Sequence, residues 1–174
     1  MIFFDTETTG LIKNIALPLS QQPRIIEIAC IREPEILDRP TFFEATFNPG
    51  VKLDSVITKI TGLTDGDLAD SPKFYEHIDD LADFFRGEEA MVAHNMPFDF
   101  KMLLMELERE VMEYKFPWPS KHIDTIEIAK PHYDGRYMKL SVLYADMIGP
   151  YEQKHRALDD VKMLIRVYHA LMAK

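Results

Sequence analysis

MIFFDTETTGL, residues 1–11, is a short apolar strand that carries two acidic side chains. Ile2, Phe3 and Phe4 predict a buried strand, which leads into Asp5 and Glu7 and ends in a turn. Side chains alternate between the two faces of a strand, so Asp5 and Glu7 share one face, roughly 7 Å apart along the chain. Two carboxylates held together beside an apolar strand are costly unless a cation lies between them. The stretch therefore predicts a divalent metal site.

The composition is ordinary for a globular protein. The chain has 174 residues, of which 47% are apolar and 28% charged, and this length supports a substantial core. It contains no apolar run long enough to span a bilayer and no signal-peptide pattern. We therefore expect a cytoplasmic protein with no membrane partner. The single cysteine, Cys30, lies in an apolar stretch and is expected to be a small buried side chain.

The net charge is −9, from 29 acidic and 20 basic residues. General nucleic-acid binders usually carry a basic face, so this balance alone argues against that class. The argument weakens if carboxylates hold metal, because two divalent ions would offset about four negative charges. Net charge therefore leaves nucleic acid open as a partner.

Apolar runs and turn residues predict strands interleaved with helices. Further strands are predicted at residues 24–31, 41–47, 89–95 and 122–125, and helices at 55–70 (two pieces broken at Gly62), 71–86, 96–114, 125–130, 140–148 and 157–174. This order is typical of an α/β domain with a mixed sheet. Because the chain shows no repeat or linker, residues 1–174 are predicted to form a single domain. Glu27, in the second strand, is either a buried acid or points away from the sheet.

Asp99 falls in the first turn of a predicted helix, directly after a strand. Strand-to-helix junctions gather functional groups in α/β sheets. A negative charge is also favoured there by the helix dipole alone. Taken in isolation, Asp99 fits the second interpretation better.

The last helix separates two neighbouring candidate acids by their helical phase. Its apolar positions are Ala157, Val161, Leu164, Tyr168 and Leu171. At 100° per residue, Asp160 lies roughly 70° from the centre of that face, whereas Asp159 lies roughly opposite and should face solvent. His155 lies about 140° round a continuous helix from Asp160, so it must occupy the preceding loop to face the same centre.

These acids and histidines resemble the motifs of the DEDDh 3′→5′ exonucleases. The resemblance is carried, in order, by DTE at residues 5–7, HNMPFD at 94–99 and HRALDD at 155–160. It implies an α/β, ribonuclease H-like fold, a mixed five-stranded β-sheet flanked by α-helices. The family includes the proofreading subunit of bacterial DNA polymerase III and exonuclease X. A tyrosine variant carries Tyr four residues before the last Asp; here that position is Arg156, and His155 fits the histidine type.

The resemblance also implies a site for two Mg²⁺ or Mn²⁺ ions. Asp5, Glu7 and Asp160 would hold one ion. Asp5 would bridge to the second, which Asp99 would support. Such oxygen ligands suit hard ions and argue against zinc. His155 would be the general base that takes a proton from the attacking water, a role that suits a side chain ordinarily titrating near neutral pH.

The resemblance places a 3′-terminal nucleotide on the turn after the first strand. Asn95 would hydrogen-bond near the penultimate sugar or phosphate, Phe98 would stack on a base and Ile60 would line the pocket. Plain core packing is a nearly equal interpretation of Leu11 and Phe98. The residues implied in substrate binding are Thr8, Thr9, Gly10, Leu11, Ile60, Asn95 and Phe98.

The favoured function is a metal-dependent 3′→5′ exonuclease that acts on single-stranded DNA and releases nucleoside 5′-monophosphates, in proofreading or repair. One alternative is an exoribonuclease of the ribonuclease T or oligoribonuclease type, which acts on RNA 3′ ends. Another is a non-catalytic subunit that binds a DNA polymerase. The retained acids argue against this last class. The chain stops after its last helix, which favours a stand-alone enzyme over one with a polymerase-binding tail.

Overall fold

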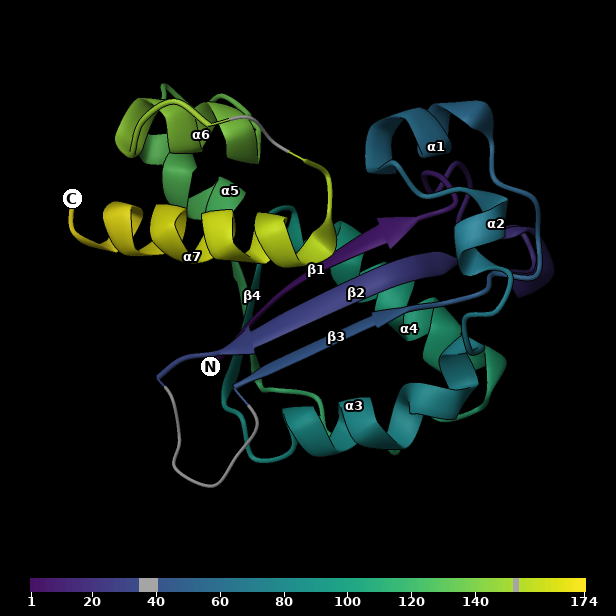
Figure 1. Ribbon diagram of the computed structural model, residues 1–174. Helices are drawn as coiled ribbons and strands as arrows, with labels where there is room; N and C mark the ends of the chain where they lie inside the picture. The colour runs from purple at the N-terminus through teal and green to yellow at the C-terminus, as the bar shows by residue number, and fades with distance from the viewer. Residues whose placement is uncertain (35–40, 152–153) are drawn as a thin grey trace.

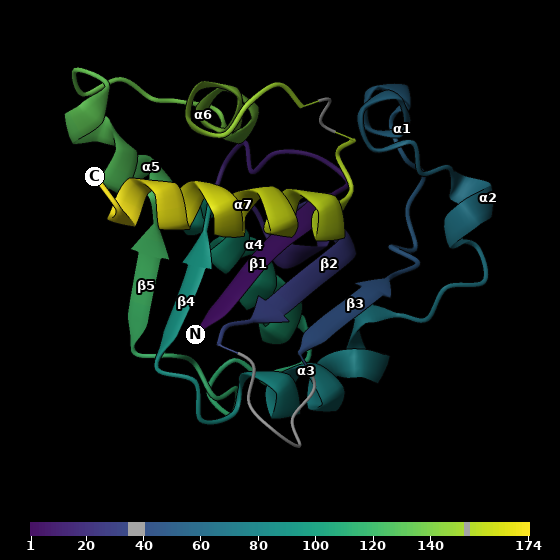
Figure 2. The ribbon, with the colours of Figure 1, turned by 60° about the vertical axis from the view of Figure 1, so that its left-hand side comes forward.

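Five strands form one mixed sheet in the computed structural model, which describes residues 1–34, 41–151 and 154–174. The strand order is β3 (Phe42–Thr46), β2 (Ile25–Arg32), β1 (Ile2–Thr8), β4 (Ala90–Ala93) and β5 (Lys121–Asp124). β1 pairs antiparallel with β2 and parallel with β4. The first strand of the chain therefore lies at the centre of the sheet, and the predicted α/β mixed five-stranded sheet is confirmed (Figure 2).

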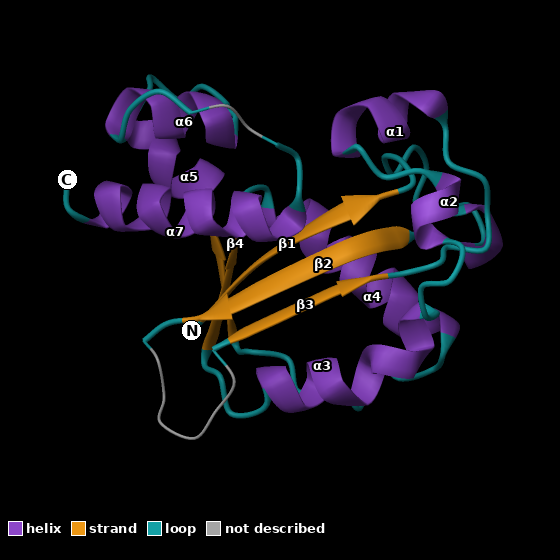
Figure 3. Cartoon of the chain, in the orientation of Figure 1, coloured by secondary structure: helices purple, strands orange, loops and turns teal. Residues whose placement is uncertain are grey.

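Helices cover both faces of the sheet (Figures 1 and 3). One face carries α7 (Ala157–Met172), with α5 (Thr125–Ala129) and α6 (Leu140–Met147) beside it. The other face carries α3 (Ile78–Phe85) and α4 (Met96–Arg109). Two short helices, α1 (Ser55–Thr61) and α2 (Asp65–Leu68), lie beyond the end of the sheet toward which β1 points. Within the described ranges, 3₁₀ turns at Leu19–Gln21, Phe74–His77 and Lys130–His132 complete the order.

The alternation of side chains along β1 divides the core into two parts. Phe3 packs into the cluster under α7, whereas Ile2 and Phe4 pack into the cluster under α3 and α4. All three are fully buried. Asp5 and Glu7 have the same parity as Phe3, so they emerge on the α7 side where the apolar part of the strand ends.

The helix predicted to run to residue 114 ends at Arg109, so that boundary was wrong. Met112 N–H donates to the Leu107 carbonyl and Val111 N–H to the Glu108 carbonyl, which is the Schellman pattern of a closed helix end. Val111 takes the left-handed φ of +56° that this closure requires. A valine there is unusual, which is why the apolar pattern concealed the stop.

The helix predicted at 71–86 is also shorter than expected, because a 3₁₀ turn (Phe74–His77) precedes α3. The two pieces broken at Gly62 are confirmed, with Gly62 ending α1 at φ +74°. Cys30 is buried, as predicted. Among the described residues, no helix combines the length and the apolar character that crossing a membrane demands.

Candidate active site

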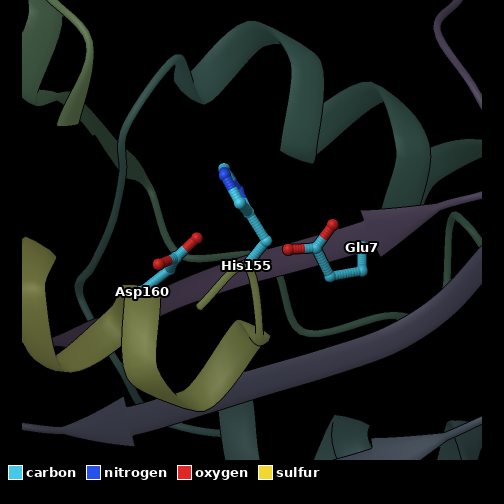
Figure 4. Close-up of side chains that lie close together, drawn as sticks. All are labelled: Glu7, His155 and Asp160. Atoms are coloured by element: carbon cyan, nitrogen blue, oxygen red, sulfur yellow. The ribbon is translucent and has the colours of Figure 1, made fainter. Parts of the chain in front are cut away.

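Glu7, His155 and Asp160 come together from two elements that are more than 140 residues apart in the sequence. Glu7 lies near the end of β1, Asp160 in the first turn of α7, and His155 in the loop before that helix. Each offers a ligand atom, and these atoms all lie within 4.8 Å of one another. Figure 4 shows the two carboxylates on either side of the histidine. This cluster is the centre of the candidate site.

Helical phase distinguishes the two acids at the start of α7 as predicted. Asp160 is 4% exposed, whereas the Asp159 side chain is 29% exposed and ion-pairs with Lys154 at 3.8 Å. His155 lies in the preceding loop with φ +50°, a left-handed conformation that brings it toward the same centre as Asp160. The loop position expected for His155 is therefore confirmed.

Asp99 is a buried acid and not a solvent-exposed helix-start residue. It is 3% exposed, and its Oδ1 accepts hydrogen bonds from both the backbone N–H and the hydroxyl of Thr6 in β1. These bonds, 3.1 and 2.7 Å long, tie the first turn of α4 to the centre of the sheet. Its charge contributes to the raised pKa of Asp5, whereas the ligand atoms that lie within 4.8 Å of one another are those of Glu7, His155 and Asp160.

Burial and mutual repulsion weaken the ionisation of three acids in this centre. Burial, followed by the charges of Asp99 and Asp160, holds the pKa of Asp5 well above its ordinary value. The pKa of Glu7 is raised to about 8, first by burial and then by Asp160. The pKa of Asp99 is raised to about 7 by burial, against the opposing hydrogen bonds from Thr6. A site built this way favours either protons or cations.

The donor set of this centre fits a hard divalent cation. Asp5, Glu7, Asp99 and Asp160 supply carboxylate oxygens, the ligands that Mg²⁺ and Mn²⁺ prefer. A cation placed among them would relieve the repulsion that raises the pKa values of Asp5 and Glu7. The residues present therefore fit the metal that the sequence predicts.

Glu27 proves to be a buried acid of the same neighbourhood, which settles the alternatives left by the sequence. It is fully buried and lies directly opposite Glu7 in the pairing of β1 with β2. Its carboxylate accepts hydrogen bonds from the Arg156 side chain and from Ala157 N–H. The sequence could not place this residue, because its role depends on strand register and on a partner 129 positions away.

The predicted substrate-binding turn continues β1 beyond the acids. Thr8 donates its hydroxyl to the Gly10 carbonyl, and Thr9 bonds in both directions with the backbone of Arg24. The Leu11 side chain is 73% exposed, so core packing does not explain it. A pocket of about 340 Å³ beside the turn is lined by Thr9, Gly10 and Leu11, among others.

The other predicted contacts are divided between the start of α4 and α1. Asn95 has a left-handed φ of +70°, and its N–H donates to Asp124 Oδ1. Phe98 is partly buried and packs against the core cluster under α4, so packing accounts for part of its surface. Ile60 is 45% exposed on α1. Substrate contact by these three residues stays a prediction.

Comparison with known proteins agrees with this geometry. The profile of the RNase_T family, described as an exonuclease family, matches residues 2–168. The chain is 33% identical over 175 residues to DNA polymerase III subunit epsilon of Rickettsia typhi, covering 98% of this chain and 72% of that protein. It is 29% identical over 176 residues to the PolC-type DNA polymerase III of Caldanaerobacter subterraneus, covering 99% of this chain but only 12% of that protein.

Solved structures share the fold. Exonuclease X in complex with 5′ overhanging duplex DNA superposes with a TM-score of 0.65 at 23% identity, over 99% of this chain and 90% of that chain. The nuclease domain of 3′hExo, a DEDDh family member bound to rAMP, gives 0.76 at 18% identity over the same shares. The ribonuclease H-like fold expected from the sequence is thereby confirmed. The chain belongs to the RNase_T exonuclease family and, as its DEDDh motifs predict, is a 3′→5′ exonuclease.

Proposed function

We propose that the protein removes nucleotides from the 3′ end of mainly single-stranded DNA, using two Mg²⁺ or Mn²⁺ ions, and releases nucleoside 5′-monophosphates. The observation that carries this proposal is the convergence of Glu7, His155 and Asp160 within 4.8 Å, beside two further acids with raised pKa values. A cluster of acids that resists ionisation without a cation, with a histidine at its edge, suits metal-assisted hydrolysis.

Each residue then has a defined task. Asp5, Glu7 and Asp160 would hold the first ion, and Asp5 with Asp99 would hold the second. When bound, the ions would supply the activation of the attacking water and the stabilisation of the leaving 3′ oxygen. His155 accepts the proton of that water on a ring nitrogen, which lies within 4.8 Å of carboxylate oxygens of Glu7 and Asp160.

The turn after β1 receives the terminal nucleotide. Backbone groups of Thr8, Thr9 and Gly10 lie where the strand ends, and exposed Leu11 offers an apolar contact for the base or sugar. Phe98 stacks against a base, Asn95 holds the next sugar or phosphate, and Ile60, which is 45% exposed on α1, contacts the terminal nucleotide.

DNA is favoured as the substrate because the relatives at 33% and 29% identity are named as DNA polymerase III proteins. The same relatives support a DNA polymerase as a partner in proofreading or repair. RNA is the second candidate, since the 3′hExo nuclease domain is bound to rAMP in its structure. The proposed roles of the acids and the histidine in hydrolysis are the same for DNA and for RNA.

The decisive experiment measures how a 5′-labelled strand becomes shorter, one nucleotide at a time. The protein is incubated with Mn²⁺ and 5′-labelled DNA or RNA of the same sequence, beside Asp5→Ala. We expect a ladder of shortened DNA, slower shortening of RNA and none with Asp5→Ala. Failure of the wild-type protein to shorten either polymer would contradict the proposal, and faster shortening of RNA would assign the second candidate.

A further inference from the structure

Glu27, which is fully buried, forms an ion pair with the half-exposed Arg156 directly beside the candidate site. Arg156 Nε lies 3.0 and 3.1 Å from the two oxygens of Glu27, and its Nη2 lies 2.5 Å from Oε1. Glu27 is fully buried, whereas 43% of the Arg156 side chain is exposed. This is a forked arginine–carboxylate pair, the geometry that fixes orientation most strictly.

The same carboxylate also closes the start of α7. Ala157 N–H donates to Glu27 Oε2 at 2.9 Å, and the residue at the helix N-cap, Arg156, supplies no side-chain cap of its own. A helix N-terminus leaves N–H groups unsatisfied and favours a negative charge. Glu27 therefore provides from β2 the cap that the loop sequence lacks.

His155 is the residue immediately before this attachment. It takes a left-handed φ of +50°, a conformation that costs a non-glycine residue free energy unless its surroundings enforce it. The chain on its C-terminal side is held at Arg156 by the ion pair and at Ala157 by the backbone hydrogen bond. The direction in which His155 leaves the helix is thus determined by Glu27.

Stability alone is a poor explanation for this pair. An ion pair with a buried partner often contributes no more than a well-packed apolar pair, because the buried charge, here that of Glu27, loses its hydration. Here the buried carboxylate also faces Glu7 across the strand pairing and adds to the repulsion that raises its pKa. The free-energy cost of burying the Glu27 carboxylate beside Glu7, next to a catalytic centre, indicates that Glu27 has a role in the site.

We propose that Glu27 and Arg156 are positioning residues, which fix the loop before α7 so that His155 reaches the attacking water. The proposal rests on the proposed function, in which His155 is the general base. In this proposal Arg156 does not bind the substrate phosphates, because its Nε and Nη2 already donate hydrogen bonds to Glu27.

The test compares three variants with wild-type protein at saturating Mn²⁺. Glu27→Gln removes the charge and keeps the shape, Arg156→Met removes the fork, and Arg156→Lys keeps a charge without the fork. We expect Glu27→Gln and Arg156→Met to lower kcat about 10- to 100-fold, the cost of a slightly misplaced catalytic group. KM should change less than about twofold, and Arg156→Lys should recover part of the loss.

A second set of variants shows whether the pair acts through His155. In a His155→Ala background, Glu27→Gln should change the residual rate less than about twofold, because the group that it positions is gone. A purely structural role would reduce the rate by the same factor in both backgrounds. That result, or wild-type kcat in Arg156→Met, would overturn the proposal.

A matched control accounts for lost stability. Arg32 at the opposite end of β2 forms a fully buried ion pair with Glu88, with Nε 2.7 Å from Oε1. Glu88→Gln should lower the melting temperature and leave kcat unchanged. If Glu27→Gln fails to fold, the kcat values of the Arg156 variants decide the proposal, because the Arg156 side chain is half-exposed and its replacement disturbs the core less. Wild-type activity in His155→Ala would instead contradict the proposed function.

Discussion

Thr6 donates two hydrogen bonds, from its backbone N–H and its hydroxyl, to the same oxygen of Asp99. Thr6 points to the face of the sheet opposite that of Asp5 and Glu7, because it has the other parity on β1. The strand therefore carries the proposed metal-binding acids on one face and hydrogen-bonds to an acid of α4 from the other. Both bonds fall on Oδ1, which makes Thr6 the group that orients the Asp99 carboxylate.

Thr6→Val, which removes only the hydroxyl bond, is expected to weaken the binding of Mn²⁺ and to lower activity about 10-fold. Second-layer contacts to metal ligands typically contribute 10- to 100-fold in affinity or activity, and one backbone bond remains here. The measurement is activity against Mn²⁺ concentration. Thr6→Ser should retain wild-type behaviour, because it keeps the hydroxyl.

The control for this variant is Thr46→Val on β3, where the hydroxyl contacts Ser71 at 3.3 Å. It removes a hydroxyl from a strand of the same sheet and should leave the Mn²⁺ dependence unchanged. If Thr6→Val binds Mn²⁺ like wild type, Asp99 does not depend on Thr6 for its orientation.

Asp160→Asn is expected to abolish exonuclease activity, with a loss of at least about 10³-fold, whereas Asp159→Asn should retain most of it. Asp160 is buried in the acidic cluster. Asp159 pairs only loosely with the exposed Lys154, an interaction of at most about 1 kcal/mol. Initial rates on a 5′-labelled oligonucleotide measure both. The opposite ranking would show that the helical phase had been assigned to the wrong neighbour.

Leu11→Ser is expected to raise KM for a DNA oligonucleotide several-fold while the melting temperature stays constant. The side chain is 73% exposed and lines the pocket beside the substrate turn, so its loss removes contact area and no core packing. Ile15→Ser is the matched control, since Ile15 is 69% exposed in the same loop. Equal effects of the two variants would exclude a specific contact by Leu11.

Local periodicity was enough to predict much of this site. The period of two along β1 placed Asp5 and Glu7 on one face, and the helical period of α7 separated Asp160 from Asp159. Local periodicity could not predict the contacts of Glu27 with Arg156, because these depend on the register of β2 against β1 and on the position of a distant helix. Sequence periodicity specifies which way a side chain points, but not what it meets.

The stop of α4 was missed for a different reason. The apolar pattern continues past Arg109, yet the chain turns at Val111 with a positive φ that no glycine or asparagine announces. The Val111 side chain is 60% exposed, so its apolar character does not extend the buried face of the helix, although the sequence pattern suggested that it did.

The acidic centre should make the metal-free protein less stable as the pH rises. The folded state holds protons on Glu7 up to a pKa of about 8 and on Asp99 up to about 7, against ordinary values of 4.5 and 3.8. Between about pH 4 and pH 8 the folded state thus binds more protons than the unfolded state, so the free energy of unfolding falls with rising pH. The stabilisation by bound protons is complete below the unfolded pKa values and lost above the folded ones.

Glu7→Gln isolates the contribution of one acid to this slope. In EDTA at pH 8.5 the variant should be more stable than wild type by an amount on the order of a few kcal/mol. Below about pH 4 the difference should vanish, because Glu7 is then neutral in both the folded and the unfolded wild-type protein. Saturating Mn²⁺ should reverse the order at pH 8.5, since the ion stabilises only a protein that binds it. Denaturant unfolding at the two pH values, with and without Mn²⁺, measures all four differences. A wild-type protein that is more stable than Glu7→Gln in EDTA at pH 8.5 would show that Glu7 is not under the repulsion that its neighbours Asp160 and Glu27 impose.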